Sequence, residues 1–172
     1  DIGGGLTNLG IELIKHCNDL NIIVDTSHLN EKGFWDVAKY SIHPLIATHS
    51  NAHAICPHTR NLTDRQLDAI KDTKGMVGVN FAPAFLRKDG KMLSDTNIQL
   101  IADHFKYLIE YLGEDHVGFG SDFDGAMMPK DLRSVLGMSK LTQLLIDQGF
   151  NNNIMHKIYH QNWLETIKRI LK

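Results

Sequence analysis

The chain has 172 residues with a formal net charge of −2, and 42% of them are hydrophobic, so its length fits one domain that buries a core without disulfide or metal staples. The near-neutral charge excludes a broadly basic surface for nucleic acid or for an acidic membrane. No apolar run approaches the roughly 18 residues of a spanning helix, and the two cysteines are too few for a disulfide framework.

The first part of the chain alternates between helix-like and strand-like segments. Thr7 is a plausible N-cap for a helix that ends near Leu20, and the β-branched run 22–24 predicts a short strand after it. Asn30 caps a second predicted helix. The apolar run 45–47 then predicts a second buried strand.

The same alternation continues to the end of the chain. Thr63 caps a third predicted helix, a strand is predicted over 76–81, and a longer helix begins at Ser94 or Asp95. The run 117–120 predicts a fourth strand, and two or three helices complete the chain.

Strands that alternate with helices indicate an α/β fold with a parallel sheet. The predicted strands are apolar throughout, as expected for a sheet that is covered on both faces. Two architectures fit this pattern, an open doubly wound sheet and part of a (β/α)8 barrel. A full barrel needs about 250 residues, so this chain holds about half of one, and it reads as a piece of a longer protein.

Polar side chains gather where the predicted strands end. Asp25 and His28 follow the first strand, His49 follows the second, Asn80 ends the third and Asp122 follows the fourth. In both candidate folds the carboxyl ends of the strands form the edge where ligands bind. We therefore expect these side chains to converge on one crevice.

Two of these residues predict a metal site. His28 and His49 are separated by about one helical crossover, which places them on adjacent strands, and imidazole is a good zinc ligand. Asp122 is either a further ligand or a general base, with Asp124 as its support. Arg60 reads equally well as a surface charge or as an anion clamp. The remaining ligands are not evident in this chain.

The other histidines have simpler interpretations. His53 and His58 lie in one loop and suggest a second metal, although two loop histidines in a histidine-rich chain need no metal. His16, His104 and His160 fall within predicted helices, where we expect them at the surface.

The strand-end motifs resemble the membrane (renal) dipeptidase family in order and spacing. They are residues 24–28 (VDTSH), 48–52 (THSNA), 60–61 (RN), 79–81 (VNF) and 118–125 (GFGSDFDG). The resemblance covers essentially the whole chain and ends near Asn162.

The resemblance implies a (β/α)8 TIM barrel of the metal-dependent, amidohydrolase-like type with a binuclear Zn²⁺ site and a dipeptide as substrate. His28 and His49 match the ligands of one zinc ion. Asp122 matches the acidic residue that carries a proton during hydrolysis of the peptide bond. Asp25 reads either as support for a ligand or as a partner of the backbone alone.

The family also implies a place for the substrate. Arg60 matches the residue that binds the substrate's terminal carboxylate, whereas Gly125 and Phe85 match positions that line the dipeptide pocket. Some members carry an aromatic hydroxyl at the position of Phe85, which phenylalanine lacks.

Several family residues are absent from this chain. The His-x-Asp pair, the bridging Glu and a further substrate-binding His all belong upstream of Asp1. Residues 1–172 are therefore expected to form a single domain, the C-terminal half of a dipeptidase barrel. We expect it to need the N-terminal half or a homo-oligomer, and to be inactive alone.

Two other functions remain open at this point. One is another amidohydrolase-like enzyme, acting on a lactone, a phosphotriester or a nucleobase. The other is an inactive, truncated fragment without a complete metal site. No signal or anchor is visible, so the sequence favours a cytoplasmic location, with no nucleic acid as partner and no membrane segment.

Overall fold

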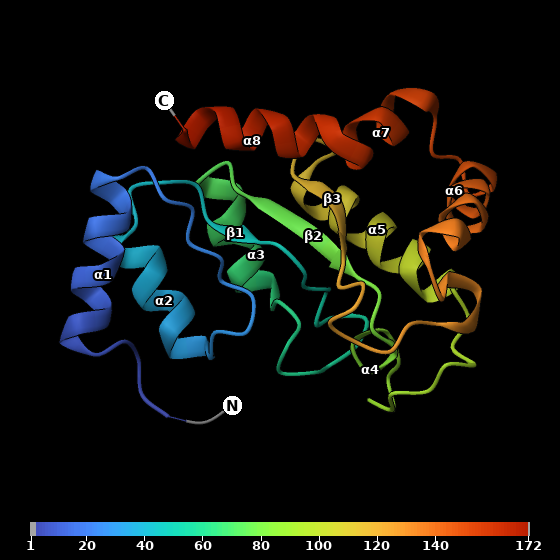
Figure 1. Cartoon of the computed structure of the whole chain (residues 1–172), viewed down its shortest axis with the longest axis horizontal. Coiled ribbons are helices and arrows are strands. Elements are labelled where there is room, and N and C mark those ends of the chain that lie inside the picture. The colour runs from blue at the N-terminus through green and yellow to red at the C-terminus, as the bar shows by residue number, and fades with distance from the viewer. Residues whose placement is uncertain (1–2, 172) are drawn as a thin grey trace.

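A parallel sheet lies at the centre of the computed structural model, which describes residues 3–171 (Figure 1). Over these residues, β1 (Ile46–Ala47), β2 (Met76–Asn80) and β3 (Val117–Ser121) lie side by side in that order. Helices connect β1 to β2 and β2 to β3. The predicted α/β fold with a parallel sheet is confirmed.

The helices surround this sheet. Their bounds are α1 (Asn8–Asp19), α2 (Glu31–Tyr40), α3 (Asp64–Asp72), α4 (Pro83–Leu86), α5 (Gln99–Leu112), α6 (Met138–Asp147), α7 (Asn152–His156) and α8 (Asn162–Ile170). A π-helical turn at Lys157–Gln161 joins α7 to α8, and 3-10 turns occupy Lys130–Leu132 and Val135–Gly137. No helix over residues 3–171 has the length and apolar character needed to cross a bilayer.

The two faces of the sheet have different coverings. Val77 and Val79 belong to the main core with residues of α3 and α5, whereas Met76 points the other way and packs with Ile170 and Trp163 of α8. In Figure 1, α8 crosses the molecule beside the ends where the strands begin. Helix α8 therefore covers this second face where the strands begin, and it does not cover the half of the face where the strands end.

Two glycines lie in that carboxyl half. A Cβ atom at Gly78 or at Gly120 would overlap the main-chain carbonyl oxygen of Thr48. At these two glycines the main chains of the neighbouring strands are in direct contact, and no side chain fits at either position. The contact lies just before the carboxyl ends of the strands.

The predicted helix starts are confirmed at three places. The side chains of Thr7 and Asn30 accept hydrogen bonds from the backbone N–H groups of α1 and α2. Thr63 forms a capping box with Gln66 at the start of α3. These caps satisfy amide groups that would otherwise lack partners.

The predicted start of the long helix at Ser94 or Asp95 is wrong. α5 begins at Gln99, and the cap residue Ile98 offers no side-chain hydrogen bond. The side chain of Asn97 instead accepts from the backbone N–H of Gln99 at 2.9 Å. This local turn sets the start of the helix later than the sequence pattern predicts.

The predicted strand over 22–24 is also absent. Asp25 makes a single parallel bridge to Ile46, and both the backbone N–H and the hydroxyl of Thr26 donate to the carbonyl oxygen of Ile46 at 2.8 Å. The backbone N–H of Ser27 then donates to the Asp25 carboxylate, which turns the chain away from the sheet. This segment therefore joins the sheet at one point only.

His104 is fully buried, although we expected it at the surface. It lies on the face of α5 that also carries Ile101, Phe105 and Leu108, all buried. Its Nδ1 atom accepts a hydrogen bond from the backbone N–H of Ala52 at 3.2 Å, whereas its Nε2 atom has no hydrogen-bond partner of normal geometry. Burial lowers the pKa of His104 to about 4.

This histidine should make the fold sensitive to acid. Below pH 6.5 the unfolded chain binds a proton at His104, whereas the folded chain does not until about pH 4. The free energy of unfolding should therefore fall by about 1.4 kcal/mol per pH unit over this window from this residue alone. Urea denaturation from pH 7 to pH 4 measures the slope. The variant His104→Gln should flatten it and the exposed-site control His16→Gln should not; equal slopes in all three proteins would contradict the assignment.

Candidate functional site

Chemistry-bearing residues meet at the carboxyl edge of the sheet, as predicted. His49 follows β1, Asn80 ends β2, and Asp122 follows β3. His28 comes from the loop after the Asp25 bridge. The parallel arrangement brings four segments that are distant in the sequence to one edge.

The two histidines predicted as metal ligands lie against each other. The Nε2 atoms of His28 and His49 are 3.0 Å apart, and the ring centroids are separated by 5.0 Å. The prediction that the two ring nitrogens lie close enough to share a metal ion is therefore confirmed. Burial lowers the pKa of His28, and the positive charge of Arg60 acts in the same direction.

The orientation of His49 is set by a short chain of hydrogen bonds. The Thr48 hydroxyl donates to Asp25 Oδ2 at 2.5 Å, because a carboxylate only accepts. The same hydroxyl oxygen lies 2.7 Å from His49 Nδ1, so Nδ1 carries the proton and donates to it. The Nε2 atom of His49 consequently presents a lone pair toward His28.

The contacts of Asp25 are compatible with both of the roles considered for it. Its Oδ1 atom accepts from the backbone N–H groups of Ser27 and Thr48 at 2.9 and 3.0 Å. Through Thr48 it also fixes the tautomer of His49. Support of this kind behind a histidine ligand is common in metal sites.

The backbone at this edge is strained. Positive φ angles outside glycine occur at His28 (70°), Ser121 (33°), Asp122 (68°) and Asp124 (64°). Residues other than glycine adopt this region at a cost of order 1 kcal/mol, and such residues concentrate at functional sites. These residues lie on the two loops that carry His28 and Asp122.

The donor set fits a partial metal site. Two imidazoles on one tetrahedral zinc ion have nitrogen atoms about 3.3 Å apart, close to the 3.0 Å between the His28 and His49 nitrogens. Across residues 3–171, however, no group of three or more His, Cys, Asp or Glu side chains is arranged to hold a metal. A complete metal site therefore needs ligands in addition to His28 and His49.

Asp122 is held by an asparagine. The Nδ2 atom of Asn80 donates to Asp122 Oδ2 at 3.0 Å. The predicted support, Asp124, is exposed to solvent, and no hydrogen bond in the described part of the chain joins it to Asp122. Sequence reasoning placed Asn80 at this edge but missed its partner.

Arg60 lies partly buried beside the histidine pair. Its Nη2 atom donates to the carbonyl oxygen of His49 at 3.4 Å, while its buried Nε atom has no partner. Burial lowers the pKa of Arg60, and the carboxylates of Asp122 and Asp25 oppose this change. Arg60 and His28 line one open hollow of about 480 Å³. A guanidinium that is partly buried beside this hollow favours the anion clamp over the surface charge.

The two predicted pocket residues lie beside these groups. The ring centroid of Phe85 is 5.3 Å from the Arg60 guanidinium carbon. The backbone N–H of Gly125 donates to the carbonyl oxygen of Asp122 at 3.2 Å. Phe85 therefore supports Arg60, and Gly125 lies next to Asp122.

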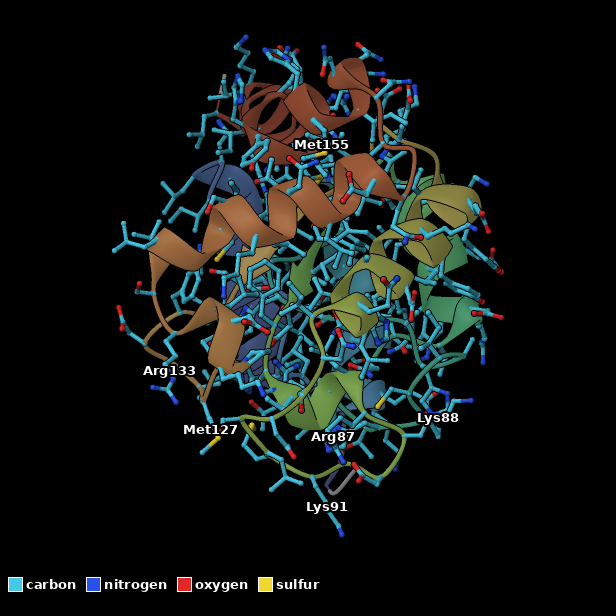
Figure 2. The ribbon with its side chains drawn as sticks, turned by 90° about the vertical axis from the view of Figure 1, so that its right-hand side faces the viewer. Arg87, Lys88, Lys91, Met127, Arg133 and Met155 are labelled. Atoms are coloured by element: carbon cyan, nitrogen blue, oxygen red, sulfur yellow. The ribbon has the colours of Figure 1, made fainter. Side chains whose placement is uncertain are left out.

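A second hollow of about 270 Å³ lies between the loops after β2 and β3. Met127 and Arg133 line part of it, and Figure 2 shows both side chains projecting from the segment after β3. None of these residues was predicted as functional.

The hydrogen-bond chain behind His49 gives a spectroscopic prediction. In zinc-free protein at pH 8, the ¹⁵N shifts of His49 should report the tautomer protonated at Nδ1, and Thr48→Val should shift the population toward the Nε2-protonated form, because the acceptor is lost. The exposed His16 serves as internal control. An Nε2-protonated His49 in the unmodified protein would contradict the proposed hydrogen bonds from His49 through Thr48 to Asp25.

Comparisons with known proteins agree with the hydrolytic metal site that these residues suggest. A family model described as membrane dipeptidase (peptidase family M19) matches residues 2–172. The chain is 51% identical over 170 residues to an uncharacterised protein in the pqqA 5' region of Klebsiella pneumoniae, which covers 99% of this chain and 63% of that protein. It is 31% identical over 169 residues to the dipeptidase tcpJ of Claviceps purpurea, across 96% of this chain and 39% of that protein.

Solved structures are similar as well. One is a metallo peptidase from Rhodobacter sphaeroides liganded with a phosphinate mimic of the dipeptide L-Ala-D-Ala, with a TM-score of 0.96 and 50% identity over 99% of this chain and 48% of that chain. Another is the probable dipeptidase PvdM from Pseudomonas aeruginosa, with a TM-score of 0.88 and 25% identity over 96% of this chain and 55% of that one. The chain spans about half the length of the proteins it matches.

Proposed function

Because the chain belongs to the membrane dipeptidase family, peptidase family M19, we propose that the protein containing it is a zinc-dependent dipeptidase. The reaction is hydrolysis of the single amide bond of a short peptide. The observation that carries the proposal is the convergence of His28, His49, Arg60 and Asp122 at one edge of the sheet.

We also propose that residues 1–172 form one domain, the C-terminal half of a (β/α)8 barrel. The parallel order of β1, β2 and β3 supports this, as does the match to about half of each solved chain. The other half, or a second copy, would supply the remaining metal ligands. The isolated chain is then inactive and needs that partner.

His28 and His49 would hold one zinc ion of a pair. Bound zinc lowers the pKa of water and polarises a carbonyl group, and this is the chemistry that amide hydrolysis needs. The protein's own part is to present the lone pair of His49 through Thr48 and Asp25, and to keep His28 neutral. The lowered pKa of His28 supports that neutral state.

Asp122 is the proton carrier in this proposal. Its carboxylate accepts a proton from the attacking water and returns it to the nitrogen of the leaving amine. The step balances, since the C–N bond breaks while a C–O bond forms and the proton ends on the amine. The carboxylate is therefore unchanged after each turnover.

Arg60 fixes the other end of the substrate. Its guanidinium borders the hollow that His28 also lines, and it binds the terminal carboxylate with two parallel hydrogen bonds. Phe85 and Gly125 line the space around the dipeptide. A carboxylate held so close to the reacting groups restricts the substrate to a short peptide.

The direct test is hydrolysis of L-Ala-L-Ala and L-Ala-D-Ala by the full-length protein. Activity should disappear with a chelator and return with Zn²⁺, and Asp122→Asn should retain metal while kcat falls about 10²- to 10⁴-fold. An Asp124→Asn variant is the matched control, because Asp124 is exposed. Hydrolysis of lactones, phosphotriesters or nucleobases in place of dipeptides would assign the other amidohydrolase-like function. Full kcat in Asp122→Asn would exclude it as proton carrier.

The clamp makes a separate prediction about KM. Arg60→Lys keeps the charge but loses the planar fork, so KM for a dipeptide should rise more than kcat falls. A dipeptide methyl ester has no free carboxylate and should be hydrolysed equally by both proteins. If the variant loses as much activity on the ester as on the free dipeptide, Arg60 is structural.

A further inference from the structure

Asn80 is the residue at the site whose contacts the proposed function leaves unused. It is fully buried at the end of β2, and its Nδ2 atom donates to Asp122 Oδ2 at 3.0 Å. We propose that Asn80 is a positioning residue that holds Asp122 Oδ2 and leaves Oδ1 as the oxygen that carries the proton. This inference rests on the proposed function.

The orientation of the Asn80 amide is fixed by its other contacts. Its Oδ1 atom accepts from the backbone N–H of Ala82 at 2.7 Å, so the amide nitrogen must face Asp122. The Asn80 backbone is held as well, because its N–H donates to Asn51 Oδ1 and its carbonyl oxygen accepts from Asn51 Nδ2, both at 3.0 Å. The donor therefore has little freedom to turn away.

The free oxygen of Asp122 lies next to a glycine. A Cβ atom at Gly125 would overlap Asp122 Oδ1, the oxygen that Asn80 does not bind. Glycine at this position keeps the space beside Oδ1 open. One carboxylate oxygen is thus tethered to a buried donor, while the other remains accessible to a proton.

Asn51 and a third buried asparagine, Asn61, reach the residue that packs against the substrate clamp. Asn51 Nδ2 and Asn61 Nδ2 donate to the carbonyl oxygen of Phe85 at 3.2 and 2.9 Å. The Phe85 ring lies beside the Arg60 guanidinium. A buried chain of asparagine amides therefore connects the proton carrier with the residue that binds the substrate's carboxylate, and it sets the distance between them.

The test exchanges the donor for an acceptor of the same shape. Asn80→Asp keeps an oxygen for the Ala82 N–H but places a second carboxylate against Asp122. In the full-length protein with Zn²⁺, kcat for L-Ala-L-Ala should fall about 10- to 100-fold, the range expected for loss of a hydrogen bond to a charged group. KM should change less than threefold, roughly, because Asn80 touches no substrate.

A swapped pair separates positioning from a general loss of structure. In Asn80→Asp combined with Asp122→Asn, the amide and the carboxylate exchange places and the hydrogen bond is restored. The urea midpoint should recover toward that of the unmodified protein, whereas kcat should remain as low as in Asp122→Asn alone. A midpoint no higher than in Asn80→Asp would overturn the inference.

The matched control is Asn18→Asp. Asn18 is a buried asparagine on α1 that donates to the Tyr40 carbonyl oxygen and accepts from the Ile42 N–H, so its contacts resemble those of Asn80. This variant should lose stability and keep its kcat. Unchanged kcat in Asn80→Asp, or an equal fall in Asn18→Asp, would refute positioning. Absence of hydrolysis by the unmodified protein would instead refute the proposed function, and the urea midpoints would still test the contact.

Discussion

The site depends above all on the bond between the Asp25 carboxylate and Thr48. It attaches the segment that carries His28 to the start of the loop that carries His49, at a point where the sheet itself offers only one bridge. The same carboxylate holds the turn at Ser27 and, through Thr48, the tautomer of His49. One partly exposed acidic group therefore brings the two histidines together.

On the other side of the crevice, amides replace carboxylates as the organising groups. Asn51, Asn61 and Asn80 are almost entirely buried, and each donates to a carbonyl or carboxylate oxygen. A buried amide carries no net charge, so it positions neighbouring groups without the desolvation cost of an ion. The result is a rigid neutral frame around the charged groups of the substrate site.

The sequence predicts what depends on local patterns and on the topology of parallel strands. The caps at Thr7, Asn30 and Thr63 follow from side chains near their own backbone, and the meeting of His28 with His49 follows from strand ends sharing an edge. The partner of Asp122, the burial of His104 and the lost strand over 22–24 depend on contacts across the chain, which a local pattern does not contain. The spacing of His104 from Ile101, Phe105 and Leu108 places it on the apolar face of the helix, and this pattern is already present in the sequence.

The floor of the crevice has a consequence for how this scaffold can vary. Gly78 and Gly120 leave the strands in contact through their backbones below the site, and a side chain at either position would strike the Thr48 carbonyl oxygen. Substitutions at these two strand positions therefore cannot change the shape of the binding site. Differences in which ligand is accepted must arise from the loops above the strands, such as the one that carries the exposed Met127.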